Sequence, residues 1–565
     1  MAEAAESTKS LTRNEVLKTN IPTLAGNLAA TLADPAAACF SSDDEQFLKF
    51  HGIYQQDDRD KRKIAKHYMF MIRGRIPGGV LTSAQYRVFD DLATRHGNQT
   101  LRITTRQSIQ FHGVVKAGLG PLMKSINESL LDTLAACGDV NRNVMAAPTP
   151  AFDNARRQLY EHSRLVSDSL LPKTRAYHAI WVEGVQLDLD AAENKDFVDP
   201  LYGKQYLPRK FKVAFVIPPS NDMDVLANDL GFIAVVENGN VVGYNLAVGG
   251  GMGRSHGNEG TFPRLADVLG FFTPDKLVDI AKAVLTIHRD FGDRTDRKHA
   301  RLKYVIAERG TDWAKAEIER RAGVVLGAVR PFEFKDTADI HDWHPQGDGK
   351  WFLGLHVSMG RIKDEGVLRL KTALRTVAEQ FPAVEFRLTA NQNLLLADVA
   401  PDQKDAVDAL LAAHGVRTSR QTTVLHAGAI GCPSLPTCGL GLAESERFLP
   451  GLLDRIEALA AEVGLAGQEI VIRMTGCPNG CARPYLAEIG FVGKAPGRYQ
   501  VWLGGNAPGT RINRVWKELL KEAEIEQELR PLLVRYAAER TPGERFGDWV
   551  ARVFWNESAP TPAAN

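Results

Sequence analysis

The chain has few cysteines, no long hydrophobic run and almost no net charge. Only six of its 565 residues are cysteine, and no apolar run approaches the roughly 18 residues that a transmembrane helix needs. The first ten residues show neither an apolar core nor an arginine-rich pattern, so we expect no secretion or import signal and a cytoplasmic protein. A net charge of +1 gives no support to a nucleic acid or membrane partner, and any functional charge must be local.

Nucleotide-binding motifs are also missing. The loop Gly249-Gly-Gly-Met-Gly253 lacks the Gly-Lys-Ser/Thr ending of a phosphate loop, and no Gly-x-Gly-x-x-Gly follows an expected strand. A redox reaction on this chain would therefore need electrons from a partner. The pair His341 and His344, followed by proline and glycine, is expected to be a polar loop rather than a metal site.

Four of the six cysteines form two close pairs. Cys432 and Cys438 are separated by five residues, and Cys477 and Cys481 by three. Clustered thiols in a chain with few cysteines are typical of metal or redox ligands in a reducing compartment. Zinc knuckles usually have Cys-x2-Cys spacing, so these pairs among proline and glycine turns favour an iron–sulfur cluster, with zinc or free thiols as the alternative. The other two cysteines are expected to be ordinary thiols: Cys39 and Cys137.

One stretch of sequence recurs far downstream. Residues 101–111 alternate polar and apolar side chains, which predicts a half-buried strand, and residues 386–396 repeat the pattern with Arg, Thr and Gln at matching offsets. The segments upstream match as well, which indicates an internal duplication. The copies differ in charge: the first has Arg106 and His112, whereas the second has neutral residues at those offsets.

The rest of the sequence predicts further helices and strands and a division of the chain into five segments. Helices are expected at 83–95 and 442–463 and over most of the C-terminus. Further strands are expected at 68–72, 211–217, 232–236, 241–248, 469–474, 487–492 and 499–503. We expect the following division: a polar extension that wraps or docks onto a partner at 1–60, a first repeat at 61–148, a first cofactor-type domain at 149–330, a second repeat at 331–425 and a cluster-binding domain at 426–565.

The thiol motif resembles a known family. Thr475-Gly-Cys-Pro-Asn-Gly-Cys481, with the upstream Cys-x5-Cys, is similar to the sirohaem-containing sulfite and nitrite reductases, and the resemblance extends from about Phe50 to Asp548. Within the family it is greatest to the assimilatory, NADPH-dependent group. Other segments that carry it are 54–60, 141–144, 206–212, 294–298 and 493–499. The resemblance implies an α+β fold of duplicated halves, with sirohaem and a 4Fe–4S cluster as cofactors. It also implies that the four paired cysteines bind the cluster and that Cys481 is the axial ligand of the sirohaem iron.

A carboxylate-rich tetrapyrrole and a small dianion both require concentrated Arg and Lys. Arg142 sits in a compact Asn-Arg-Asn turn, and Lys210 and Lys212 share one face of an extended segment. The resemblance implies that four residues surround the substrate anion: Arg73, Arg142, Lys210 and Lys212. It implies sirohaem contacts from Arg102, Arg106, Gln110 and His112, and the expected cofactor-binding set also contains Lys303 and Asn479. Further basic candidates are Arg294, Arg297 and Lys298.

The function that the resemblance implies is the six-electron reduction of sulfite to sulfide, in sulfate assimilation and cysteine biosynthesis. Lysines are the better proton donors, because an ammonium can shift its pKa and a guanidinium cannot. Nitrite-specific relatives usually have Asn at the position of Lys212, so lysine favours sulfite. The expected electron donor is an NADPH-oxidising flavoprotein. Two alternatives remain: a ferredoxin-dependent sulfite or nitrite reductase, and a non-catalytic protein with a structural cluster.

Overall fold

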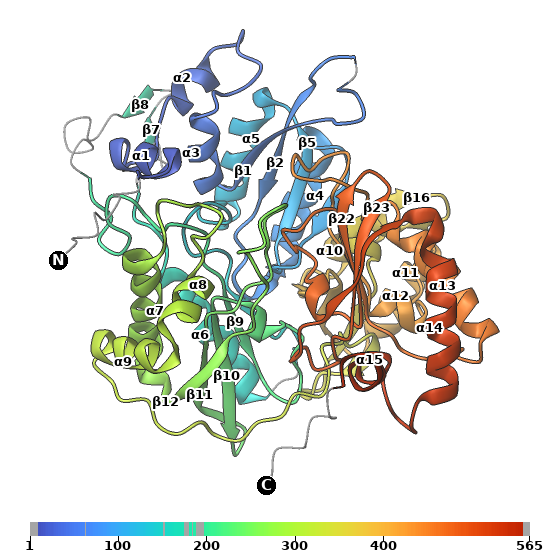
Figure 1. Cartoon of the computed structure of the whole chain (residues 1–565). Coiled ribbons are helices and arrows are strands. Elements are labelled where there is room, and N and C mark those ends of the chain that lie inside the picture. Colours follow the sequence, from blue (N-terminus) through green and yellow to red (C-terminus); the bar gives the residue numbers. More distant parts are fainter. Residues whose placement is uncertain are drawn as a thin grey trace, which may run out of the picture.

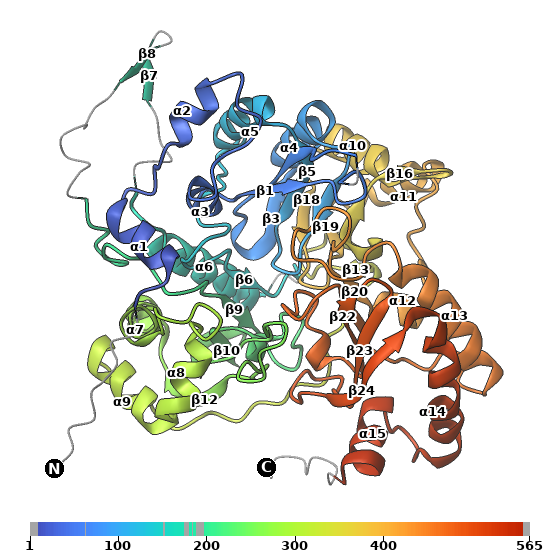
Figure 2. The same cartoon turned by 45° about the horizontal axis from the view of Figure 1, so that its top comes forward.

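The computed structural model describes residues 10–62, 64–150, 153–174, 180–182, 185–187 and 197–556. Within these ranges no helix has the length and apolar character needed to cross a membrane. Four five-stranded sheets form the framework of the described chain. In Figure 2 two of them lie side by side at the top, in blue and yellow, with a green unit below on the left and a red unit below on the right.

The two repeats form the upper pair of sheets and exchange a strand. The first sheet has the order β1 (Ile53–Asp57), β2 (Tyr68–Arg73), β5 (Ile109–Val114), β4 (Leu101–Ile103) and β15 (Arg361–Ile362). The second has the order β13 (Asp342–Pro345), β14 (Trp351–Leu355), β19 (Leu394–Val399), β18 (Glu385–Leu388) and β3 (Val80–Thr82). Each repeat thus donates a short strand, β3 or β15, to the sheet of the other. One buried hydrophobic core joins them, and the covering helices are α4 (Ser83–His96), α5 (Lys116–Glu128), α10 (Leu370–Gln380) and α11 (Lys404–Ala413).

The prediction of one continuous strand at 101–111 and at 386–396 was wrong, because each segment is a hairpin. Gln107 and Gln392 have positive φ angles of 48° and 73° at the turns. In each turn the glutamine N–H donates to the carbonyl of the threonine three residues earlier, Thr104 or Thr389. The N–H of that threonine donates in turn to the carbonyl four residues later, in Ser108 or Asn393. The polar residues of the turn continue the polar–apolar alternation of the strands on either side. The sequence pattern alone therefore could not distinguish a hairpin from one continuous strand. The duplication itself is confirmed in detail.

The central unit is a mixed sheet covered by helices. Its strand order is β12 (Asp267–Phe272), β11 (Asn240–Val248), β10 (Leu230–Glu237), β9 (Val213–Val216) and β6 (Met145–Ala146). β6, β9 and β10 are parallel, and β11 and β12 continue antiparallel. The helices are α6 (Asn154–Ser169), α7 (Leu277–Phe291), α8 (Leu302–Arg309) and α9 (Thr311–Ala322). The expected strands at 211–217, 232–236 and 241–248 are confirmed as β9, β10 and β11.

The C-terminal unit repeats that topology. Its order is β20 (Ile430–Gly431), β21 (Ile472–Thr475), β22 (Ile489–Ala495), β23 (Arg498–Leu503) and β24 (Arg514–Lys521), parallel for the first three and antiparallel beyond. Its helices are α12 (Val424–Ala427), α13 (Leu449–Glu462), α14 (Ile525–Glu539) and α15 (Phe546–Trp555). Strand β24 was not predicted. The helix expected from residue 442 begins only at Leu449, because Leu442 and Ala443 bind the carbonyl of Gly476 through their N–H groups.

The two lower units share buried ion pairs at equivalent positions. Arg301 precedes α8 and pairs with Asp229, which precedes β10; Arg545 precedes α15 and pairs with Glu488, which precedes β22. The duplication therefore includes the two lower units as well as the repeats, since each repeat is followed in the chain by one unit. Residues 342–344 of the expected polar loop lie in edge strand β13, because they pair with β14, and a ring nitrogen of His344 lies 2.6 Å from the His341 carbonyl oxygen.

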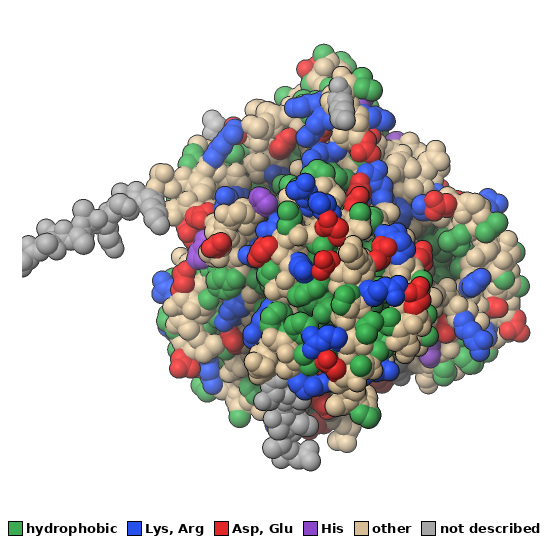
Figure 3. All heavy atoms as spheres, turned by 45° about the vertical axis from the view of Figure 1, so that its right-hand side comes forward, with side chains coloured by type: hydrophobic (Ala, Val, Ile, Leu, Met, Phe, Trp, Pro, Cys, Tyr) green, Lys and Arg blue, Asp and Glu red, His purple; other side chains and the backbone are tan. Residues whose placement is uncertain are grey.

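The N-terminal helices lie across the first repeat and the central unit, at the upper left of Figure 1: α1 (Arg13–Asn20), α2 (Leu28–Ala33) and α3 (Asp44–Phe50). Two small hairpins complete the description: β7 (Ile180–Val182) with β8 (Val185–Leu187), and β16 (Asp364–Glu365) with β17 (Leu368–Arg369). On the face shown in Figure 3, acidic and basic side chains are intermingled. Charge of one sign gathers instead inside the molecule.

Candidate active site

The first and third paired cysteines follow the carboxyl ends of two neighbouring parallel strands. Cys432 comes directly after β20, and Cys477 lies two residues after β21. The N–H of Gly476 donates to the Cys432 sulfur at 3.3 Å, and the Asn479 amide donates to the Cys477 sulfur at 3.5 Å. A Cβ on Gly476 would lie 1.7 Å from Ser434 Oγ, so only glycine fits this turn. N–H groups directed at sulfur stabilise the thiolate form.

The four paired thiols lie close enough to influence one another. Burial, followed by the neighbouring thiols, raises the pKa of Cys432 above its ordinary range; burial and then Cys481 raise the pKa of Cys477 to about 12. Such thiols ionise at neutral pH only when metal cations stabilise the charge. No group of three or more His, Cys, Asp or Glu side chains among the described residues is arranged to hold a metal ion. The mutual effects on pKa show that the four paired thiols are neighbours, and a four-iron cluster takes one thiolate for each iron.

Cys481 faces two groups at once. It contributes to the raised pKa values of Cys432, Cys438 and Cys477, and it is also one of the charges that act on Lys212. Unlike Cys432 and Cys477, it is exposed. The structure therefore brings Cys481 between the cluster thiols and the basic side chains.

The basic group gathers around the turn that holds Arg142. The guanidinium of Arg142 donates to the Gly138 carbonyl at 3.1 and 3.2 Å. Burial and then Lys212, Arg209, Arg142 and Arg301 hold the pKa of Lys210 well below its usual value. For Lys212 the causes are burial, then Arg106 and Arg301, opposed by Asp229 and Cys481, and its pKa is also well below the usual value. Uncompensated positive charge of this kind is suited to binding an anion.

Arg73 joins this group with a fixed orientation. Its Nη1 lies 3.1 Å from the Cys137 sulfur. With the Gln110 amide oxygen turned toward it, Arg73 donates to that oxygen at 2.5 and 3.2 Å. Gln110 therefore orients Arg73, which is a different role from the expected sirohaem contact.

Of the expected sirohaem contacts, Arg106 lies in the basic group and two others do not. Arg106 donates to Asn228 Oδ1 at 2.9 Å, and burial and then Arg142 lower its pKa to about 9. Arg102 is buried and pairs with Glu446 at 2.9 Å, and His112 lies 3.2 Å from Arg361, which also pairs with Glu446. Arg102 and His112 thus share an ion network with Glu446 and Arg361, which borders Cys432 through Arg102 and Arg73 through His112.

Lys303 holds the glycine-rich loop 249–253 of the central unit, which approaches Asn479 in the C-terminal unit. Lys303 donates to the carbonyls of Gly251 and Gly253 at 3.1 and 2.7 Å, and burial and then Arg301 lower its pKa to about 6. A Cβ on Gly253 would lie 3.2 Å from the Asn479 carbonyl oxygen. Lys303 therefore fastens the glycine-rich loop 249–253 against the Cys477 loop.

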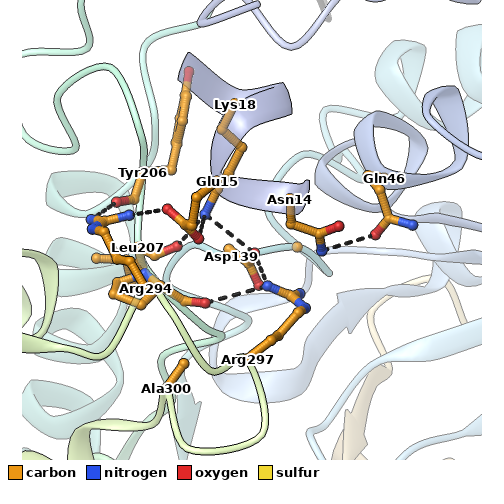
Figure 4. Close-up of polar contacts among 12 residues, drawn as sticks. Asn14, Glu15, Lys18, Gln46, Asp139, Tyr206, Leu207, Arg294, Arg297 and Ala300 are labelled. Carbon is orange, nitrogen blue, oxygen red and sulfur yellow. Dashed lines mark hydrogen bonds and ion pairs between the residues drawn. The ribbon is translucent and has the colours of Figure 1, made fainter. Parts of the chain in front are cut away.

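The candidate Arg294 binds the N-terminal helix, and the candidate Arg297 binds Asp139, which that helix also contacts. Figure 4 shows Lys18 of α1 bound to Glu15 at 2.6 Å and to Asp139 at 3.5 Å, while Arg294 pairs with Glu15 and Arg297 with Asp139. Asp139 lies three residues before Arg142. Helix α1 is thus part of the wall behind the basic group. Lys298, the last basic candidate, uses its backbone N–H to bind Asp296.

Four residues near the basic group were not singled out as site residues from the sequence. The Tyr54 hydroxyl bonds Arg142, and burial raises the pKa of Tyr54. Burial and then Arg297 lower the pKa of Arg209 to about 10, and Asp139 and Cys137 complete the set. Tyr54 and Arg209 lie inside the segments 54–60 and 206–212 that carried the family resemblance, which was the available signal.

Comparisons with known proteins agree with this geometry. Residues 161–326 match the nitrite and sulphite reductase 4Fe-4S domain, and residues 62–129 and 344–414 match the nitrite/sulfite reductase ferredoxin-like half domain. The sulfite reductase (NADPH) hemoprotein beta-component of Myxococcus xanthus is 49% identical over 98% of both chains. The protein of the same name from Geobacillus kaustophilus is 49% identical over 94% of this chain and 93% of its own.

A solved structure shows the same fold at lower identity. The Mycobacterium tuberculosis NirA protein has a TM-score of 0.76 and 22% identity, covering 96% of both chains. The duplicated half domains therefore have the expected architecture. By sequence, fold and site, this chain belongs to the nitrite and sulphite reductase family.

Proposed function

We propose that this chain is the catalytic haemoprotein component of an assimilatory, NADPH-dependent sulfite reductase, which converts sulfite to sulfide for cysteine biosynthesis in the cytoplasm. The observation that carries the proposal is the cation group around Lys210 and Lys212, which lies next to the exposed thiol of Cys481. A dianion is the ligand that such a group stabilises best.

The proposed cofactors are sirohaem and a 4Fe–4S cluster, which together supply an iron centre and successive electrons when bound. Cys432, Cys438, Cys477 and Cys481 would hold the cluster, and Cys481 would also bind the sirohaem iron. Arg106 is the best placed of the proposed sirohaem contacts, because its guanidinium lies among the basic side chains around Lys212. Arg102, His112 and Lys303 would support the site indirectly, because they hold the loops that line it.

The arginine and lysine side chains would have different roles toward the anion. Arg73 and Arg142 stay charged and would hold sulfite oxygens through fixed N–H groups, with Gln110 and the Gly138 carbonyl setting their orientation. Lys210 and Lys212 would donate protons as each S–O bond breaks, because a lowered pKa makes an ammonium a readier acid. The same cations stabilise the negative charge that develops on the departing oxygens.

Electrons would come from a partner protein, since the sequence contains no recognisable nucleotide-binding motif. An NADPH-oxidising flavoprotein is the proposed donor, by analogy with the name of the relatives in Myxococcus and Geobacillus. Ferredoxin is the second candidate. The segment Cys481-Ala-Arg-Pro-Tyr485 is similar to the ferredoxin-dependent group, and this keeps the candidate open.

The test is sulfite turnover by the chain produced together with sirohaem synthesis. We expect a haem absorption spectrum and sulfide release with a flavoprotein plus NADPH, and slower release with reduced ferredoxin. Reduced methyl viologen serves as a donor that needs no docking. A chain without haem absorption, or a loaded chain that releases no sulfide with any donor, would refute the proposed function.

A pH profile tests the two lysines. Both ammonium groups have pKa values well below the roughly 10.4 of a free lysine, and they hold the anion only while protonated. As pH rises through the lowered pKa values the site loses positive charge, so kcat/KM for sulfite should fall on an alkaline limb far below pH 10. A Lys212→Arg variant keeps its charge, and its limb should move to higher pH. Sulfite's own ionisation is common to both enzymes, so identical profiles would contradict the assignment.

A further inference from the structure

The central and C-terminal units place two oppositely charged residues at equivalent positions. Asp224 precedes the short helix η3 (Val225–Ala227), and Arg483 precedes its counterpart η6 (Pro484–Leu486). Both have left-handed backbone, with φ of 44° and 54°. Each also lies six residues before a matching strand, since β10 begins at Leu230 and β22 at Ile489. The duplication therefore brings an acid from one copy to face a base from the other.

Asp224 and Arg483 form a buried ion pair, and the same guanidinium reaches both repeats. Arg483 Nε binds Asp224 Oδ2, and its Nη1 donates to the Thr105 carbonyl at 3.3 Å in the turn of the first repeat. Its Nη2 donates to the Ala390 carbonyl at 3.1 Å and to Asn391 Oδ1 at 3.0 Å in the turn of the second repeat. One side chain thus joins four segments that are distant in sequence.

The same contacts extend to Cys481. Thr105 Oγ1 donates to the Cys481 carbonyl at 3.0 Å, and Arg483 is only two residues further along the chain. The Cys481 backbone is therefore fastened on one side by the first repeat and on the other by the Asp224–Arg483 pair. Asn391 occupies the position that corresponds to Arg106 in the other repeat, so the copy without charge supplies an acceptor for Arg483.

We propose that Asp224 and Arg483 are positioning residues, which set the location of the Cys481 thiol relative to the cation group by clamping its loop to both repeat turns. This inference rests on the proposed function, because it assigns to Cys481 the junction between cluster and substrate site. A small displacement of that sulfur would change how cluster and haem communicate, while the other three cysteines would keep their places.

We call the Asp224–Arg483 pair and its bonds to the two repeat turns the clamp. It is tested with Arg483→Lys, which keeps the charge but cannot reach the carbonyls of Thr105 and Ala390 together. We expect kcat for sulfite to fall about 10²-fold, as for a misplaced reacting group, with KM changed less than kcat. Iron and sirohaem contents should stay at parent levels, while the haem absorption and the electron paramagnetic resonance signals shift. Turnover driven by methyl viologen should fall as much as turnover driven by the flavoprotein.

Arg473→Lys is the matched control. Arg473 pairs with the same Asp224 oxygen at 2.7 Å and is also buried, and its other contact is the Thr337 hydroxyl at 3.4 Å. It reaches the second repeat turn only through Thr337, whose carbonyl binds Asn391, whereas Arg483 bonds the Thr105 and Ala390 carbonyls directly. The Arg473→Lys variant should have a lower free energy of unfolding than the parent, but its haem spectrum should match that of the parent. Equal shifts in both variants, or an unshifted spectrum with kcat within twofold of the parent for Arg483→Lys, would overturn the proposal.

A milder pair of variants covers the case in which Arg483→Lys does not fold. Thr105→Val removes only the hydroxyl bond to the Cys481 carbonyl, and Thr105→Ser restores the hydroxyl. The valine variant should shift the haem spectrum and the serine variant should not; matching spectra would refute the clamp. A parent enzyme that is loaded but inactive with sulfite would count against the proposed function alone, because the spectra of the variants report on the clamp independently.

Discussion

A Cys481→Ser variant should lose sulfite reduction, with kcat lower by about 10⁴-fold or more, as when a group that the whole reaction depends on is removed. Serine keeps the size of the side chain but replaces a soft thiolate, the ligand that iron–sulfur centres take, by a hydroxyl that stays protonated. Because Cys481 lies between the cluster thiols and the cations, both the iron–sulfur and the haem signals should change. Absorption and electron paramagnetic resonance spectra measure the two separately.

Cys39→Ser is the control for this experiment, since Cys39 is a free, half-buried thiol of the N-terminal segment that lies beside Tyr68. It should retain full turnover and both signals. Retained turnover in Cys481→Ser, or loss of only the cluster signal, would remove Cys481 from the junction and leave it as an ordinary cluster ligand.

The second large effect concerns the choice between sulfite and nitrite. Lys212→Asn should lower kcat/KM for sulfite by about 10²-fold, the usual cost of removing one group that stabilises developing charge. Nitrite carries a single charge and loses less Coulomb energy when one ammonium disappears. The ratio of the two efficiencies should therefore move toward nitrite by about tenfold, which corresponds to about 1.4 kcal/mol of transition-state discrimination.

Lys204→Asn is the matched control, because Lys204 lies in the same loop and is exposed. Its ratio of sulfite to nitrite efficiency should equal that of the parent. If Lys212→Asn also leaves the ratio unchanged, then Lys212 contributes to binding anions in general and not to discrimination between them.

The proximity of the paired cysteines was predictable because each close pair in sequence lies in one loop, and the two loops follow neighbouring strand ends. The same held for Lys210 and Lys212, which flank buried Phe211 in an extended segment. The family resemblance implied sirohaem contacts for Arg102 and Arg106 together, in what appeared to be one strand. The turn at Gln107 separates them, so that Arg106 reaches the cations and Arg102 pairs with Glu446.

Other features depended on contacts that no local pattern encodes. The relation between the central and C-terminal units appears in sequence only at isolated positions. Examples are the pairs Asp229–Arg301 and Glu488–Arg545, whose partners lie dozens of residues apart. Asp224 and Arg483 similarly appear as unremarkable charged residues in sequence. Only the assembled fold shows that they meet.

The buried network of helix α1 has a consequence for the order of events during synthesis. Glu15 leaves the ribosome 279 residues before Arg294, its partner, which at 5 to 20 residues per second is a delay of about 15 to 55 s. Before that moment Lys18 can balance only one of the two buried acids Glu15 and Asp139, so burying the cluster would leave one carboxylate without a cation, at a cost of several kcal/mol. Helix α1 should therefore dock late, so that the wall behind the cation group closes only after the central unit exists. Until then the site would remain open on that side, which leaves time for large prosthetic groups to enter.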